Sequence, residues 1–274
     1  RLEGLTYGEL VALSMKAGQL GPDGLAAEAA KIRVKRFAAV GLKPETSLPR
    51  LEDIPLDSYF REHLHRHLRL GACVVLVGPP GSGKTYIASA MAGSMGLQTY
   101  STSAAKFLES TRETFTTLMA TLRYASNTSV IINEFDRLVS AEMRIKTAFL
   151  TYLERRPPSW LCGTAVNLDL LLESSDRDGG HPELVRPGRV DEVIPIPPPR
   201  DRETIESIVR HLIARHRIQL DDMMISRIVR TCHGEPLYPS DHLALIMRAA
   251  SGERHPEITV DTVARERQLV RIIA

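Results

Sequence analysis

The chain has 274 residues, of which 43% are hydrophobic and 25% charged, and its net charge is +2. These values indicate a globular protein of one large domain or two modest ones, and they argue against a protein devoted to blanket electrostatic binding of nucleic acid. The apolar runs are shorter than the roughly 20 residues that span a bilayer, so we expect no membrane segment in this chain. Three well-separated cysteines without zinc-ligand spacing favour reduced thiols and a cytoplasmic location.

Residues 1–50 are predicted to form helices and a linker. A capping-box pattern at Thr6–Glu9 opens the first helix, Gly18 is its predicted end, and a second helix is expected from about 25 to 40. The prolines between 41 and 50 favour an extended linker. Because the first residue is Arg rather than Met, we expect the chain to be part of a longer protein or a processed product.

Residues 51–198 alternate short apolar segments with helix-forming segments. This alternation predicts an α/β domain with a doubly wound parallel sheet. The expected strands are 72–77, 97–101, 129–133, 160–166 and 190–196.

Residues 199–274 carry no further strand pattern and are predicted to form a small all-α domain. The expected helices are 201–216, 221–232, 240–251 and 259–272. Asp201 and Asp221 are good N-cap candidates for the first two, because a short acidic side chain accepts the free N–H groups of a first helical turn.

The segment that follows the first expected strand matches the phosphate-binding pattern G-x-x-x-x-G-K-[ST]. A strand precedes it and a helix follows, so its backbone N–H groups and the helix N-terminus are placed to cradle phosphates. Lys84 is expected to reach the β- and γ-phosphates, and the Thr85 hydroxyl to bind Mg²⁺. The predicted nucleotide-binding residues here are Gly78, Pro79, Pro80, Gly81, Ser82, Gly83, Lys84, Thr85 and Tyr86.

An apolar strand that ends in Asn133-Glu134 lies about fifty residues after this loop. Such a strand normally supplies the Mg²⁺ contact and the group that activates the attacking water. Glu134 occupies the water-activating position, and Asn133 stands at the Mg²⁺ position, where an Asp would be expected.

Together these segments resemble the AAA family of ATPases, over roughly residues 51–250. The resemblance implies a P-loop domain of the AAA+ type (51–198) followed by a helical lid (199–274), with ATP and Mg²⁺ as cofactors. It also implies that Asn167, in a segment similar to the family's sensor-1 strand, contacts the γ-phosphate or the attacking water.

Arg186-Pro187-Gly188-Arg189 is similar to the family's R-P-G-R segment, the most specific part of the resemblance. By that resemblance, Arg186 and Arg189 are arginine fingers that complete a neighbouring subunit's site, which implies a homo-oligomer, usually a hexameric ring. A planar guanidinium suits this role, because it stabilises charge spread over the phosphoryl oxygens. Ordinary surface ion pairing is the alternative for both residues.

Members of this family usually thread polypeptide past a pore-loop aromatic. Phe107 and Leu108 fall at that place, with Glu109 where the family has Gly. The resemblance therefore implies that Phe107 and Leu108 contact a polypeptide, and the alternative is a core-facing Phe on an amphipathic helix.

Two departures concern the nucleotide. Asn133 offers a neutral acceptor, and the difference from a charged one is about 1 kcal/mol, or roughly tenfold, which predicts a slow but active ATPase. Ser240-Asp241 falls at the sensor-2 position, with Asp241 as a predicted nucleotide contact but Pro239 in place of Gly. Either His211 or His216 is a candidate for the adenine side.

Three alternating histidines precede the first expected strand. His63 and His67 have the i, i+4 spacing of helical metal ligands, but the sequence places no acidic or cysteine partner beside them. A polar helix face is the favoured interpretation.

The leading functional hypothesis is a ring-forming ATPase that remodels a protein partner. A nucleic-acid-associated ATPase is a second hypothesis, opposed by the modest charge and the R-P-G-R segment. A slow, nucleotide-gated scaffold is a third, supported only by Asn133.

Overall fold

The computed structural model describes residues 7–109, 111–123, 127–138, 141–155, 158–168, 171 and 188–251. Its centre is a six-stranded sheet in the order β1-β3-β4-β5-β2-β6. The strands are β1 (Lys43–Glu45), β2 (Cys73–Val77), β3 (Gln98–Ser103), β4 (Thr128–Asn133), β5 (Trp160–Ala165) and β6 (Glu192–Pro195). The last five pair in parallel, whereas β1 pairs antiparallel with β3 at the edge.

The five expected strands are confirmed, and β1 is an addition. β2 and β5 are buried along their whole length, as near-continuous apolar runs in a parallel sheet require. The doubly wound prediction therefore holds, except that the sheet carries one antiparallel edge strand. That strand lies within the segment predicted to be extended.

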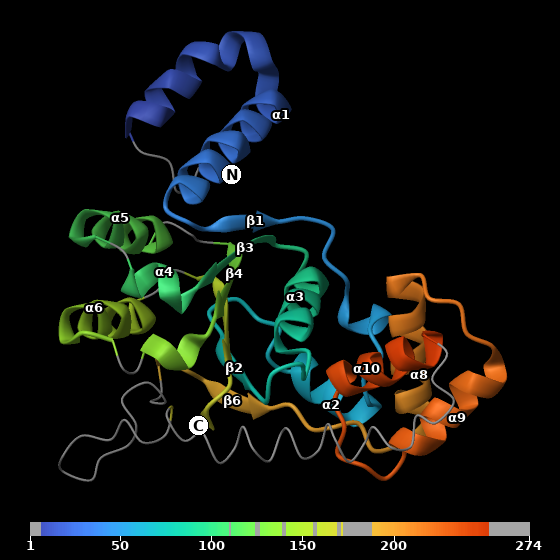
Figure 1. The fold of residues 1–274 in the computed structure, drawn as a ribbon. Helices are drawn as coiled ribbons and strands as arrows, with labels where there is room; N and C mark the ends of the chain where they lie inside the picture. The colour runs from blue at the N-terminus through green and yellow to red at the C-terminus, as the bar shows by residue number, and fades with distance from the viewer. Residues whose placement is uncertain are drawn as a thin grey trace.

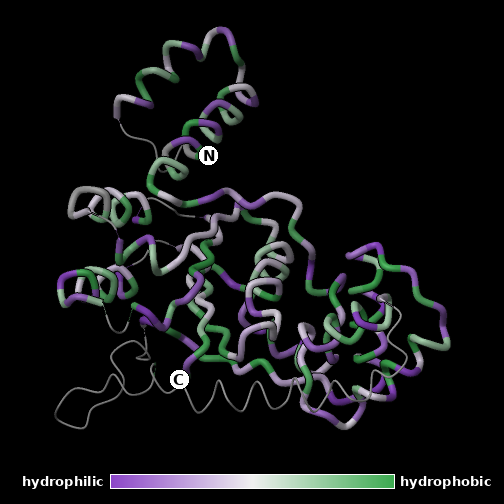
Figure 2. Tube along the Cα trace, viewed as in Figure 1, coloured by the Kyte–Doolittle hydropathy of each residue, from purple (hydrophilic) through white to green (hydrophobic). Residues whose placement is uncertain are grey.

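Helices cover both faces of the sheet (Figure 1). On one side lie α2 (Ser58–His65), α3 (Lys84–Met95) and the short helical turn η1 (Leu51–Asp53). On the other side lie α4 (Ala104–Leu108), α5 (Arg112–Arg123), α6 (Met143–Glu154) and the turn η2 (Phe135–Leu138). Each side has its own buried apolar cluster against the strands, and Figure 2 shows hydrophobic stretches in the central strands, whereas β1 at the edge is hydrophilic.

One close packing contact inside the sheet depends on a glycine. A Cβ on Gly163 of β5 would lie 2.7 Å from the ring of Phe135. The missing side chain therefore lets the Phe135 ring pack directly on the sheet, just after β4. Phe135 is the first residue of η2, so this contact lies between Glu134 and Asp136, the two acidic residues of the site described below.

A helical unit follows β6, made of α8 (Arg202–His216), α9 (Asp222–Cys232) and α10 (Pro239–Ala250). Asp201 and Asp221 cap the first two helices, as predicted, because their carboxylates accept the backbone N–H groups of Thr204 and Met224. These helices share a separate buried cluster. The helix expected at 259–272 lies outside the described residues.

The N-terminal helix α1 (Tyr7–Ala39) breaks at Gly21, whose φ of 62° and ψ of 176° are not helical, followed by Pro22. The break therefore comes three residues later than the predicted end at Gly18. The C-terminal end of α1 joins the main core, where the rings of Phe37 and Tyr100 lie 4.4 Å apart. Thr6, the expected cap, is outside the described residues, and none of the described helices is long and apolar enough to cross a membrane.

Candidate nucleotide site

The glycine-rich loop joins the end of β2 to the start of α3. Gly81 and Gly83 have φ angles of 77° and 87°, a region that favours glycine, and Gly83 is the N-cap of α3. A Cβ on Gly78 would lie 2.8 Å from the Ser82 hydroxyl. The loop is thus wound tightly around the N-terminus of α3, where backbone N–H groups favour an anion.

Lys84 is folded back onto the loop. Its ammonium Nζ donates to the carbonyl oxygens of Gly78 at 2.7 Å and of Pro79 at 2.8 Å. Burial lowers the pKa of the Lys84 ammonium, and the nearby Asp136 carboxylate opposes that effect. A phosphate would give this half-buried cation a charged acceptor in place of two neutral ones.

Asn133 links the start of α3 and strand β5 through hydrogen bonds. Its side-chain oxygen Oδ1 accepts the Thr85 hydroxyl at 3.0 Å and the Thr164 hydroxyl of β5 at 3.1 Å. The predicted pair of Mg²⁺ residues, Thr85 and Asn133, is therefore brought together at the carboxyl end of the sheet, where ligands bind in open α/β folds.

Glu134 follows directly and adopts a strained conformation. Its φ of 57° is uncommon for a residue with a side chain, and such outliers gather at functional sites. Its carboxylate pairs with Arg137 at 3.2 Å and is about half exposed. The predicted water activator therefore lies at the end of β4, directly after the Asn133 that bonds Thr85, and its ion pair with Arg137 is at the surface.

Asp136 is a functional candidate that the sequence reasoning did not assign. It is buried, and its Oδ2 accepts the backbone N–H groups of Val166 at 3.1 Å and Asn167 at 3.0 Å. The carboxylate thereby fixes the backbone of Asn167 and places negative charge near Lys84. The signal was present, because Asp136 is the second acid of the segment Asn133-Glu134-Phe135-Asp136.

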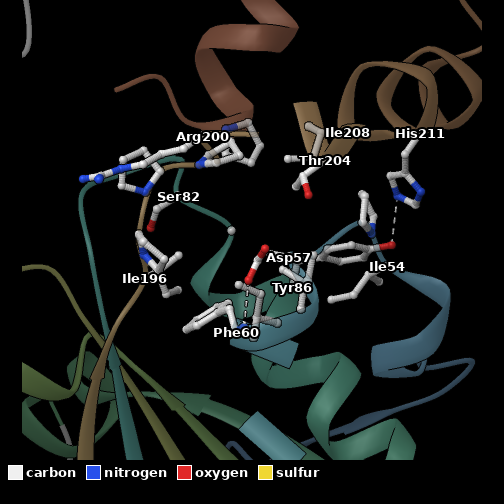
Figure 3. Close-up of a pocket in the computed structure, with 18 of the residues that line it drawn as sticks. Ile54, Asp57, Phe60, Ser82, Tyr86, Ile196, Arg200, Thr204, Ile208 and His211 are labelled. Atoms are coloured by element: carbon white, nitrogen blue, oxygen red, sulfur yellow. Dashed lines mark hydrogen bonds between the residues drawn. The ribbon is translucent and has the colours of Figure 1, made fainter. Parts of the chain in front are cut away.

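A cavity of about 750 Å³ opens between the sheet domain and the helical unit, and Ser82 and Gly83 form part of its wall (Figure 3). On its far side, the Tyr86 hydroxyl and His211 Nε2 lie 3.1 Å apart, and the Arg215 guanidinium stacks 4.7 Å from the Tyr86 ring centre. Burial, together with Arg215, lowers the pKa of His211. His211 lines this cavity and His216 does not, which distinguishes the two adenine-side candidates.

The first turn of α10 touches the phosphate-binding loop directly. The Ser240 N–H donates to the Gly81 carbonyl at 3.3 Å, and a Cβ on Gly81 would overlap the Ser240 side chain. Asp241 is buried, and its carboxylate accepts the Tyr238 N–H at 2.8 Å, so it holds the start of α10 and does not line the cavity. The predicted contact between Asp241 and nucleotide stays a prediction, whereas Pro239 is part of the cavity wall.

Comparison with known proteins identifies this arrangement. Residues 74–198 match the family described as "ATPase family associated with various cellular activities (AAA)". This stretch is a domain of the AAA ATPase family. The chain is 29% identical over 226 residues to the ATP-dependent zinc metalloprotease FTSH 9, chloroplastic, of Arabidopsis thaliana, covering 74% of this chain and 27% of that protein. It is 27% identical over 233 residues to spastin of Anopheles gambiae, covering 80% of this chain and 27% of that protein.

Solved AAA structures agree with the fold. A structure titled "Structural Basis for Katanin Self-Assembly" superposes with a TM-score of 0.61 at 21% identity, over 78% of this chain and 76% of that one. The FIGL-1 AAA domain in complex with ADP superposes with a TM-score of 0.61 at 20% identity, over 81% and 79%. At this identity the likeness shows the fold, a mixed α/β AAA domain with a helical lid. The chain spans about a quarter of the length of these two curated relatives.

The AAA arginine segment is only partly described. Arg186 lies outside the described residues. The Nε and Nη2 of Arg189 both donate to one carboxylate oxygen, Oε1, of Glu154 in the same chain, at 2.9 and 2.7 Å. The Arg189 side chain is 15% exposed. To act as the predicted arginine finger, Arg189 would therefore have to leave Glu154 and contact a phosphate bound by the neighbouring subunit.

The pore-loop prediction for Phe107 is wrong. Phe107 is 0% exposed and packs edge-on against Phe115 and Phe149, with ring centres 6.4 and 5.5 Å away. Ala104 and Phe107, one turn apart on α4, both face the core. A buried ring cannot grip a polypeptide, so the core-facing alternative holds, although Leu108 remains 37% exposed.

Proposed function

We propose that this AAA domain binds Mg²⁺–ATP between its sheet domain and its helical lid and hydrolyses it slowly. The observation that carries the proposal is the grouping around one loop of the Lys84 ammonium, the Thr85–Asn133 oxygen pair and the Asp136 carboxylate, which lies near Lys84 and accepts the backbone N–H of Asn167. These groups supply the positive charge, the cation ligands and the polar contacts that phosphoryl transfer needs.

The residues present fit this cofactor. The Ser82 hydroxyl is buried, lines the cavity and has no hydrogen-bond partner among the described residues, so it is a polar group that a ligand can satisfy. The Thr85 hydroxyl and the Asn133 side-chain oxygen are the hard ligands that Mg²⁺ prefers. Glu134 would orient the attacking water, and Asn167 would contact the γ-phosphate or that water.

We further propose a ring in which Arg186 and Arg189 complete the site of the next subunit. A complementation experiment tests the shared site. Lys84→Ala and Arg189→Ala each damage one half of it, so each alone is expected to hydrolyse at background. Their mixture is expected to recover part of the wild-type rate, because some interfaces then join an intact Lys84 to an intact Arg189.

An exposed arginine on α9 provides the matched control. Arg230→Ala is expected to hydrolyse like wild type alone, and mixing it with Lys84→Ala should give only the activity of the wild-type-like subunits. If the mixture of Lys84→Ala and Arg189→Ala stays at the sum of its components, the shared-site proposal fails.

The proposed substrate class is a polypeptide. The relatives include proteins named as ATP-dependent proteases, and the net charge of +2 gives no blanket attraction to nucleic acid. Adding an unfolded protein such as casein is expected to raise the ATPase rate, whereas single- or double-stranded DNA is not. Stimulation by DNA alone would favour the nucleic-acid-associated alternative. Nucleotide-dependent assembly with background turnover would favour the scaffold.

A further inference from the structure

Two histidines and one glutamate meet at a point that the nucleotide site does not use. His63 lies in the last turn of α2, His67 just beyond that helix, and Glu192 is the first residue of the edge strand β6. His63 Nε2 lies 3.3 Å from one Glu192 carboxylate oxygen, and His67 Nε2 lies 2.9 Å from the other. The sequence offered the two histidines at ligand spacing, and the fold supplies the acidic partner that it could not place.

The three groups have the chemistry and spacing of a cation site. Their ligand atoms all lie within 4.8 Å of one another. Ligand atoms about 2.0–2.1 Å from a tetrahedral Zn²⁺ are about 3.3 Å apart, so shifts of at most about 1.5 Å would close the set around an ion. Two imidazoles and one carboxylate are a ligand set that Zn²⁺ takes with a fourth position left for water.

Solvent can reach the fourth position. The side chains of His63, His67 and Glu192 are 30%, 13% and 39% exposed, so the cluster lies at the surface with one side covered. An ion can enter from that side without opening the core. His63 also contributes to the wall of the cavity between the two domains.

The backbone around the cluster is already held in place. The indole N–H of Trp160, on β5, donates to the His67 carbonyl at 3.1 Å, and the His67 N–H donates to the Leu64 carbonyl at 3.1 Å. Glu192 is paired in the sheet with Val74 of β2. The backbone on both sides of the cluster is thus held by hydrogen bonds before any ion binds, and such pre-organisation favours binding.

In the proposed site the two imidazoles would bind the cation in their neutral form, each through the free lone pair of a ring nitrogen. A simple His⁺–Glu⁻ ion pair is the competing account of the contact.

We propose that His63, His67 and Glu192 bind one divalent transition cation, with Zn²⁺ as the best match, and that the ion fastens α2 to strand β6 beside the interdomain cavity. The proposal stands on this geometry and is independent of ATP hydrolysis.

The same helix provides a matched control. His65 Nε2 lies 3.3 Å from a carboxylate oxygen of Glu52, so it is a His–Glu pair in the same surroundings but without a second imidazole. The experiment titrates the metal-stripped, nucleotide-free chain with Zn²⁺ by calorimetry. Wild type and His65→Gln are expected to bind one equivalent equally, whereas His63→Gln, His67→Gln and Glu192→Gln are each expected to weaken that binding by at least about tenfold.

Co²⁺ gives a second readout that needs no variant. Bound by this set, Co²⁺ is expected to show the intense visible absorption of a four-coordinate site, and Zn²⁺ should displace it. Circular dichroism verifies that each variant is folded. Absence of the Co²⁺ band in wild type, or equal Zn²⁺ affinity and stoichiometry in wild type and the His63→Gln/His67→Gln double variant, overturns the proposal.

Discussion

The contact between the lid and the phosphate-binding loop gives the most detailed prediction. Replacing Gly81 by Ala places a Cβ over the Cβ and Oγ of Ser240. The hydroxyl can rotate away, but the Ser240 Cβ is fixed to the backbone of α10. Restoring an ordinary contact therefore requires α10 to retreat by about 1 Å.

Two separate costs contribute to the expected effect. Alanine at a φ of 77° costs about 1–2 kcal/mol, and the overlap costs about 1–3 kcal/mol more. We expect Gly81→Ala to lower the free energy of unfolding or of lid docking by about 2–5 kcal/mol in total. Because the proposed ATP site spans both domains, ATP affinity should fall at least about tenfold.

A pair of variants separates these two costs. In Gly81→Ala/Ser240→Gly the overlapping side chain is gone, so ATP affinity should partly recover, while the backbone cost stays. Gly71 has a φ of 85° with nothing within 4 Å of an added Cβ, so Gly71→Ala measures the backbone cost alone in urea unfolding. If the double variant binds ATP no better than Gly81→Ala, the loop–lid contact is not the cause and the reasoning is refuted.

Four further predictions concern single positions. Asn133→Asp should raise Mg²⁺-dependent phosphate release about five- to tenfold, because a charged acceptor adds about 1 kcal/mol; an unchanged rate would show that Asn133 does not limit turnover. Phe107→Ala should lower the free energy of unfolding by about 3–5 kcal/mol in urea, and an unchanged unfolding midpoint would contradict its burial. Arg189→Ala should lower the ATP hydrolysis rate of assembled protein about 10³-fold or more. Glu154→Gln breaks only the ion pair within the chain and should leave that rate unchanged. If both variants lose the same activity, the ion pair with Glu154, and not a contact with the neighbouring subunit's phosphate, is what matters. The pKa of His211 is lowered on folding, so the unfolded chain binds more protons than the folded chain. The contribution of His211 to stability is therefore fully present above about pH 6.5 and declines as the pH falls below it. His211→Gln should flatten this decline in chemical unfolding, and a pH profile identical to that of wild type would refute the role given to His211.

Much of the fold could be predicted from sequence because the parallel strands are buried on both faces. Segments such as Cys73–Val77 are apolar and buried along their whole length, which makes them recognisable in the sequence as strands of a parallel sheet. β1 was missed as a strand because Lys43–Glu45 is short and polar. It pairs with β3 where the end of α1 also packs, with Phe37 against Tyr100, and no local sequence pattern records such a tertiary arrangement.

The candidate site shows the same difference between features set by local sequence and features set by tertiary packing. The phosphate-binding loop and the Thr85–Asn133 pair were predictable, because a contiguous motif and a strand end fix their positions. Phe107 was not, since an aromatic one turn from Ala104 fits a core face and a pore loop equally well, and only tertiary packing decides. The meeting of His67 with Glu192 depends on strand order, which places residues far apart in the chain side by side.

Hydrolysis of ATP at this site is the central claim, and phosphate release measures it most directly. The assembled wild-type chain should release phosphate from ATP slowly and only with Mg²⁺. Glu134→Gln should bind ATP with affinity within about threefold of wild type but release phosphate at background, since general-base loss costs about 10²–10⁴ in rate. If wild type and Glu134→Gln release phosphate at the same background rate at concentrations where light scattering shows assembly, the chain is not an ATPase and the account is contradicted.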